Sequence, residues 1–161
     1  MNSDLQPLLQ ILRGNNIDAL HVPDRHAARD LVLSLIPEGA VVGYGDSITL
    51  RQIGVVAALE QGPYTFHNAW EPGITVEENL ERKRRSLTSD VFVTGTNALT
   101  MDGRLVNVDG HGNRVAAMLF GPKKVIVVVG INKIVPDLDA AFARIREVAA
   151  PANVRRHTSF D

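Results

Sequence analysis

Two glycine-rich loops in the sequence carry side chains that could bind an anion. The first follows the short apolar run 40–43 and consists of Gly43, Tyr44, Gly45, Asp46 and Ser47. Glycines allow a sharp turn, and N–H groups at the helix start expected after Ser47 favour a phosphate or a carboxylate. The loop is neither a GxGxxG motif nor a P-loop, since it has no Lys-Ser/Thr pair. A tight turn capped by Ser47 explains it equally well, and the Asp46 carboxylate would repel a phosphate.

The second loop is the stretch TGTNALTMDGRLVNVDGHGNR, residues 94–114. Its centre, Asp102-Gly103 between Leu99 and Leu105, predicts the tip of a β-hairpin and needs no ligand. Its second half opens a helix, where glycines, an N-capping Asn113 and a cation favour an anionic ligand. We therefore predict ligand contacts at the two ends of this stretch, from Asn97, Asn107, Asp109, Gly110, Gly112, Asn113 and Arg114.

Weaker candidates lie outside these loops. Lys133 follows the last aliphatic run and is equally well explained as an anion contact or as a surface lysine. His67 and His111 lack metal-ligand spacing, so a structural or exposed histidine is favoured. The run Arg82–Arg85 follows three glutamates and is typical of a solvated helix face with i,i+4 pairs. Trp70 is favoured as a partly buried core residue, with a stacking lid or an interface anchor as alternatives.

Alternating helical and strand-like patterns must position these loops. Helices are predicted over residues 5–12, 24–36, 47–58, 75–87, 115–120 and 138–145, and strands over 17–22, 40–43, 64–67, 91–93 and 125–129. Thr75 and Glu78 have capping-box spacing, and Val125–Val129 is typical of a strand covered on both faces. The alternation predicts an α/β three-layer fold with a mostly parallel sheet. Ligands of such sheets bind beyond the carboxyl ends of the strands, where both loops lie.

Length and composition limit the classes of protein to consider. The 161 residues are enough for one domain, and a formal net charge of -1 gives no global positive field for nucleic acid or anionic lipid. The absence of cysteine excludes a disulfide framework, a thiolate nucleophile and cysteine ligation of a cluster by this chain. Without a signal-peptide pattern or an apolar run of about 18 residues, we expect a cytoplasmic protein with no membrane span. No metal site is predicted, and nothing identifies a cofactor.

Three separated blocks carry a family resemblance. They read VVGYGDSITLRQIG, TGTNALTMDGRLVNVDGHGNRVAAMLFGPKKVIVVVGINKIV and AAPANVRR, and together they extend over residues 40–156. In this order they closely resemble the LUD (lactate utilisation) domain family, LutC/YkgG type. The resemblance implies a NagB/RpiA/CoA-transferase-like, Rossmann-like fold in a single LUD domain over 1–161, with an N-terminal helix and short strand in 1–22. It also implies oxidation of L-lactate to pyruvate together with iron–sulfur partner proteins.

Two departures from the family pattern are visible. Met101 stands where the family usually has Glu, so a role of that carboxylate is lost. Many relatives continue after APANVRR into a cysteine-rich tail, which this chain lacks. A metal site that depends on the tail is therefore not expected.

A more distant likeness, to sugar-phosphate isomerases related to initiation factor 2B, bears on mechanism. Asn97 occupies the position of their aspartate, and an amide cannot act as a general base. We therefore expect an accessory or small-anion-binding subunit, in which Asn97 and Asn107 orient the ligand. One alternative is a stand-alone transferase or isomerase acting on a CoA thioester or sugar phosphate through Asp46 or Asp109. Another is a regulatory homo-oligomer that senses a metabolite and associates through the Trp70 loop.

Overall fold

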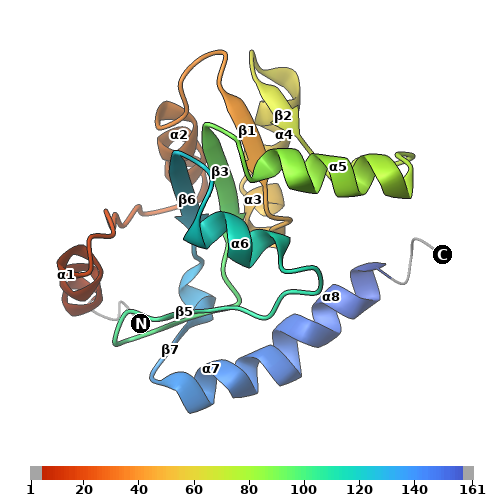
Figure 1. The fold of residues 1–161 in the computed structure, drawn as a ribbon. Helices are drawn as coiled ribbons and strands as arrows, with labels where there is room; N and C mark the ends of the chain where they lie inside the picture. Colours follow the sequence, from red (N-terminus) through yellow and green to blue (C-terminus); the bar gives the residue numbers. More distant parts are fainter. Residues whose placement is uncertain (1–4, 158–161) are drawn as a thin grey trace. The chain divides into compact units, whose positions relative to one another are not determined.

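The computed structural model of the chain describes residues 5–157, which form two compact units (Figure 1). The sheet unit comprises residues 23–95 and 109–128, and the hairpin unit comprises residues 5–22, 96–108 and 129–157. Each unit has its own sheet and its own hydrophobic clusters. The two units are therefore interleaved along the sequence.

The sheet unit contains a four-stranded parallel sheet in the order β2-β1-β3-β6. Its strands are β1 (Val41–Tyr44), β2 (Thr65–His67), β3 (Val91–Gly95) and β6 (Lys124–Val128). The register pairs Val42 with Phe66 on one side and with Val91 on the other. The mostly parallel sheet predicted from the alternation of elements is thus confirmed.

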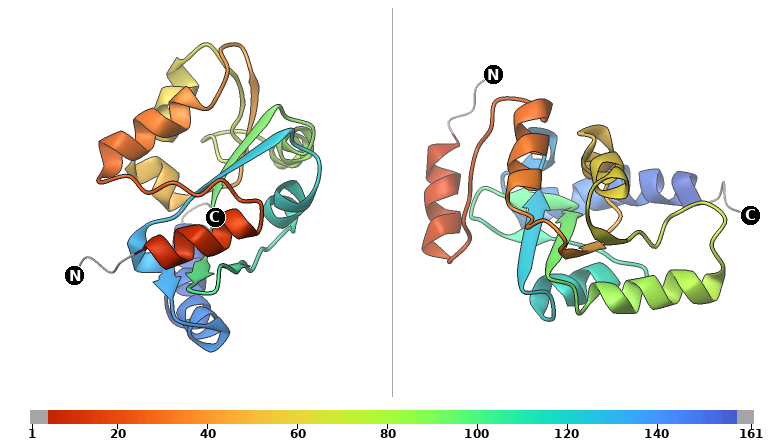
Figure 2. Two further views of the ribbon diagram at one scale, coloured as in Figure 1. Left: turned by 90° about the vertical axis from the view of Figure 1, so that its left-hand side faces the viewer. Right: turned by 90° about the horizontal axis from the view of Figure 1, so that it is seen from above.

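Helices cover both faces of this sheet, as predicted for a three-layer, Rossmann-like fold. Figure 2 (right) shows α2 (Arg25–Ser34), α3 (Ile48–Gln52) and α4 (Val55–Gln61) on one face, and α5 (Val76–Ser86) and α6 (Asn113–Leu119) on the other. Side chains at the N-caps begin three of them: Asp24 for α2, Ser47 for α3 and Thr75 for α5. The predicted cap at Ser47 is confirmed, because its hydroxyl accepts the Leu50 N–H.

Three local predictions for the sheet unit are corrected. The helix expected over 47–58 is broken between α3 and α4, because Gly54 has a φ of 79°, which ends a right-handed helix. The capping box is half formed: Thr75 Oγ1 accepts the Glu78 N–H at 3.1 Å, whereas the Glu78 carboxylate pairs with Arg82. Strand β6 pairs only with β3 among the described strands and its valines are half-buried, so it is an edge strand. Local hydropathy does not encode strand order.

The hairpin unit is built around a three-stranded sheet in the order β5-β4-β7. Strands β4 (Ala98–Thr100) and β5 (Leu105–Val106) are antiparallel, which confirms the predicted hairpin, and Gly103 in its turn has a φ of 86°. Strand β7 (Ile134–Val135), which was not predicted, pairs in parallel with β4 after the short 3-10 turn η1 (Ile131–Lys133). Helix α1 (Gln6–Gly14) packs its leucines against Leu99 of β4.

Two predictions for the hairpin unit were wrong. Residues 17–22 form no strand; instead the Arg13 guanidinium binds the Ala19 carbonyl, with Nη2 at 2.7 Å. Helix α7 (Leu138–Arg144) does not end the chain's helical structure, but continues through a π-helical turn, η2 (Ile145–Ala149), into α8 (Ala150–His157). Pro151 follows this π-helical turn, and the wider turn accommodates the proline ring within the continuous helix.

Candidate functional site

Five charged residues of the sheet unit form what we call the charged cluster. Two ion pairs are at its ends: Arg51 lies 3.8 Å from Asp46, and Arg114 lies 3.7 Å from Asp109. Between them is Lys83, whose ammonium is within the electrostatic reach of both carboxylates. The first pair follows β1, Asp109 and Arg114 flank the start of α6, and Lys83 belongs to α5. The cluster therefore combines three cations with two carboxylates.

Three of the four residues predicted in the first loop have structural roles. Gly43 lets α5 approach β1, since a Cβ there would lie 2.8 Å from Ser86 Cβ. Gly45 lies against β3, where a Cβ would be 2.8 Å from Thr94 Cβ. Ser47 is buried and caps α3, and its N–H donates to the Tyr44 hydroxyl at 2.9 Å.

Asp46 is the residue of this loop whose side chain belongs to the charged cluster. Its φ of 43° is in the left-handed region, which Asp adopts more readily than most other residues. The side chain is only 8% exposed, although its partner Arg51 is 42% exposed. The turn after β1 thus holds a carboxylate in a nearly buried position.

The second predicted loop also contains a cap that the sequence did not reveal. Asp109 Oδ2 accepts the N–H groups of Arg114 at 2.8 Å and Val115 at 3.2 Å. The N-cap of α6 is Gly112, with a φ of 75°, and Asn113 is the first residue of the helix, so the prediction of Asn113 as the cap was wrong. A Cβ added at Gly110 would meet no other atom within 4 Å. The negative charge expected at this helix start is supplied by the protein itself.

Besides Arg51, sequence analysis missed one further residue of the cluster, Lys83. It is 8% exposed, and its ammonium lies 5.5 Å from the centroid of the Trp70 ring. Within the described residues the ammonium makes no hydrogen bond and no ion pair. Burial lowers the pKa of Lys83 below its ordinary value, and the charges of Asp109 and Asp46 oppose that shift.

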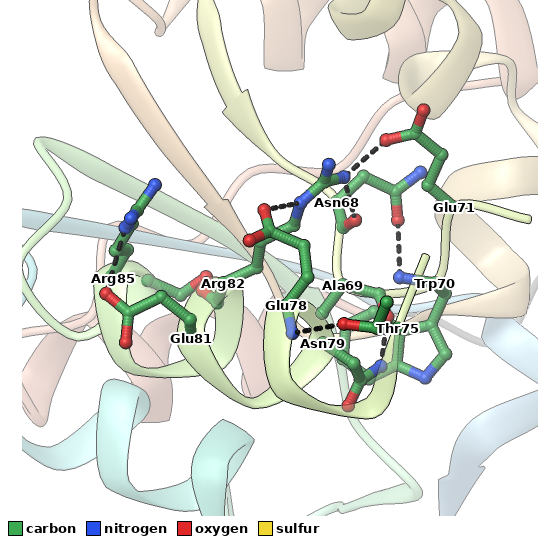
Figure 3. Close-up of polar contacts among 11 residues, drawn as sticks. Asn68, Ala69, Trp70, Glu71, Thr75, Glu78, Asn79, Glu81, Arg82 and Arg85 are labelled. Carbon is green, nitrogen blue, oxygen red and sulfur yellow. Dashed lines mark hydrogen bonds and ion pairs between the residues drawn. The ribbon is translucent and has the colours of Figure 1, made fainter. Parts of the chain in front are cut away.

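A hydrogen-bond network joins α5 to the preceding loop, which contains Trp70 (Figure 3). The Trp70 ring lies beside the Lys83 ammonium. Arg82 is the centre of the network: it donates to the Asn68 carbonyl at 2.9 Å and pairs with the carboxylates of Glu78 and Glu71. The Asn68 side chain in turn accepts the Trp70 N–H at 3.0 Å. Trp70 is partly buried against the core of the sheet unit, which confirms the favoured prediction for this residue.

The buried ring of Tyr44 packs against the ring of Trp70. The two rings meet edge to face with centroids 5.5 Å apart, and the Arg51 guanidinium lies 5.9 Å above the Tyr44 ring. Burial, and next the charge of Asp46, raise the pKa of Tyr44 to about 12. The phenol is therefore protonated at neutral pH, and it donates to the Ser47 carbonyl at 3.2 Å.

Three predicted site residues belong to the hairpin unit and lie close to one another there. The Asn97 side chain accepts the Val108 N–H at 2.8 Å, and the Asn107 side chain accepts the Asn97 N–H at 3.2 Å. Lys133 donates to the Thr96 carbonyl at 3.0 Å. These bonds fix the two ends of the β4–β5 hairpin, and the use of the same side chains for a ligand stays a prediction.

A comparison of the sequence with models of known protein families identifies the family of this chain. The model of the LUD domain matches residues 5–160, nearly the whole chain and parts of both units. The chain belongs to the LUD domain family. No curated protein sequence matches it significantly. The predicted resemblance of the three sequence blocks to the LUD domain family is thereby confirmed.

The sheet unit of this LUD domain also has open hollows near the amino ends of its strands, at the edge of the sheet opposite the charged cluster. One is lined by residues of the α5–β3 and α6–β6 connections, including Leu87, Ala116 and Phe120, and another by Pro37, Asp90 and Lys124. Neither hollow contains a residue of the charged cluster. Among residues 5–157 no group of three or more His, Asp or Glu could hold a metal ion, and no helix in that range is long and apolar enough to cross a membrane.

His67 gives the LUD domain a testable pH dependence. Burial, and next the charges of Arg85 and Arg82, lower its pKa, while Glu78 opposes the shift. A folded-state pKa below the unfolded value of about 6.5 means that stability is complete above that pH and is lost as the pH falls through the folded pKa. We expect His67→Gln to reduce the loss of stability between about pH 7 and pH 5, measured by urea unfolding. The exposed His111→Gln is the control, and an equal effect of both changes would contradict the assignment.

Proposed function

We propose that this LUD domain is a LutC-type lactate utilisation protein that binds a small carboxylate at the charged cluster. The observation that carries the proposal is Lys83, a residue that is only 8% exposed and whose ammonium makes no hydrogen bond or ion pair among the described residues. A cation on a largely buried side chain that makes no hydrogen bond is stabilised by an anion that brings its own hydrogen-bond acceptors. With three cations and two carboxylates, the cluster has one positive charge to neutralise.

The ligand fits the chemistry of lactate utilisation. L-lactate and pyruvate each carry one carboxylate and one further oxygen, so one such acid would neutralise the cluster. The chain has no cysteine that could ligate an iron–sulfur cluster. We therefore propose an accessory, anion-binding subunit in the cytoplasm, which acts with iron–sulfur partner proteins in the oxidation of L-lactate to pyruvate.

The transferase alternative has less support from the same residues. A carboxylate that attacks an acyl-CoA must present a free oxygen to the thioester carbonyl. The Asp109 carboxylate already accepts two backbone N–H groups and pairs with Arg114, while Asp46 is nearly buried. These contacts favour carboxylates that position neighbouring cations.

Two measurements test the proposal. Titration calorimetry of the full chain with L-lactate and with pyruvate should show saturable binding, and chloride at matched ionic strength should not compete. Deletion of the gene should impair growth on L-lactate, and iron–sulfur proteins should co-purify with the tagged chain. The proposal is contradicted if neither acid binds, growth is unchanged and no partner co-purifies.

A further inference from the structure

Lys83 combines two properties that a simple anion anchor does not require. Its amine lies over an aromatic ring, with the nitrogen 5.5 Å from the Trp70 centroid, and makes no hydrogen bond within the described residues. Lysine residues that act as nucleophiles are held in this way, in a desolvated position where the neutral amine is accessible. The lowered pKa caused by burial supports the same role.

The position of the Trp70 ring is fixed by several contacts. The backbone N–H of Trp70 donates to the Asn68 side chain, whose own amide donates to Glu60 at 2.8 Å, and the ring meets the edge of buried Tyr44. Helix α5 packs against β1, so the backbone of Lys83 is equally well supported. The amine thus lies over a ring that several contacts hold in place, on a helix that packs against β1. Covalent catalysis requires such positioning. With 8% of its surface exposed, Lys83 is not completely sealed from solvent.

The charged groups around Lys83 can hold the acid whose carbonyl the amine attacks. Asp46 and Asp109 both act electrostatically on Lys83, and their guanidinium partners Arg51 and Arg114 lie 3.8 and 3.7 Å from them. The guanidinium groups are suited to the carboxylate of an incoming acid.

We propose that Lys83 forms an imine with the carbonyl carbon of a 2-oxo acid such as pyruvate. The neutral amine attacks the carbonyl carbon, a C–N bond forms, and the carbonyl π pair becomes a hydroxyl after protonation. The two protons of the nitrogen pass through solvent water to the former carbonyl oxygen, the first to make that hydroxyl and the second to release it as water. Amine and ketone thus give imine and one water, with no oxidant or reductant.

This reaction distinguishes the two acids of lactate oxidation. Pyruvate has the carbonyl that Lys83 can attack, whereas the 2-hydroxyl carbon of L-lactate is saturated and cannot form an imine. The site would therefore hold L-lactate by charge alone and hold pyruvate covalently and reversibly. The inference rests on the proposed binding of a small carboxylate, and it adds a selectivity for the oxidised acid.

Reductive trapping of the full chain tests the imine. The protein is incubated with pyruvate and cyanoborohydride, and the adduct is located by intact mass and peptide mapping. We expect one adduct, at Lys83, none with L-lactate, and loss of the adduct in Lys83→Arg. The variant Lys124→Arg is the matched control, because Lys124 is exposed, and it should be labelled at Lys83 like the wild type.

The outcomes separate the imine from the binding site. Labelling spread over exposed lysines and unchanged in Lys83→Arg overturns the imine. Absence of an adduct, together with calorimetric binding of pyruvate, overturns the imine and leaves the proposed function standing. Absence of both adduct and binding overturns both.

Discussion

Replacing Lys83 with Met is expected to abolish binding of L-lactate and pyruvate while raising the free energy of unfolding by up to about 1 kcal/mol. The gain follows from the lowered pKa, because the folded protein holds this proton less tightly than the unfolded chain does. At neutral pH the charged amine therefore opposes folding. Methionine removes the charge, keeps the length of the side chain and makes favourable contacts with an aromatic ring such as Trp70. Urea unfolding and calorimetry measure the two effects.

The matched control is Lys124→Met. Lys124 is exposed and donates to the Leu35 carbonyl at 3.1 Å, so its loss should not raise stability or affect binding. The difference between Lys83→Met and wild type should also shrink as the pH rises above about 11, where the amine is neutral in the folded protein and in the unfolded chain. A variant less stable than the Lys124 control would show that attraction to Asp46 and Asp109 outweighs the burial of the charge, and Lys83 would then be a structural residue.

Lys83 was not predicted as a site residue, because the charged residues next to it in the sequence indicated a solvated helix face. It lies in a run of four cations that follows three glutamates, the pattern of a solvated helix face. The pairs Arg82–Glu78 and Arg85–Glu81 are indeed formed at i,i+4. Helical phase was the available signal, since Lys83 shares the face of Leu80 and Leu87, three and four residues away. A cation on the apolar face of a helix is therefore a better site candidate than a cation on the solvated face of the same charged run.

The fold could be predicted where the signal is local. The cap at Ser47 and the turn at Asp102-Gly103 depend on neighbouring residues, and the helix start and the hairpin that they predicted were found. Strand order and the pairing of β7 depend on residues far apart in the sequence, which periodicity cannot detect. The break at Gly54 was missed because a single glycine inside a helical pattern is often tolerated.

The site could be predicted only in part for a similar reason. Sequence position identified loops at the carboxyl edge of the sheet, and Asp46, Asp109 and Arg114 of those loops belong to the charged cluster. Whether a glycine is needed for packing or for a ligand depends on which residues lie next to it in the folded protein. Gly43 and Gly45 look like ligand-loop glycines, yet β1 needs both for packing against its neighbours.

Gly45→Ala is expected to destabilise the protein by about 3 kcal/mol or more, which would leave little folded protein in a domain of ordinary stability. The new Cβ would lie 2.8 Å from Thr94 Cβ and 2.9 Å from Phe92 Cζ, both in residues that are fully buried. The backbone cannot retreat, because the Gly45 N–H donates to the Val93 carbonyl at 3.0 Å. Urea unfolding followed by far-UV circular dichroism measures the loss.

Gly110→Ala provides the comparison that separates packing from ligand binding. A Cβ at Gly110 meets no atom within 4 Å, and its φ is not in the left-handed region, so stability should change by less than about 0.5 kcal/mol. If Gly45→Ala instead unfolds at the wild-type urea concentration but no longer binds pyruvate, this glycine would be required by a ligand that approaches the backbone. The loop after β1 would then act through its N–H groups, and the side-chain cluster around Lys83 would have a secondary part in binding.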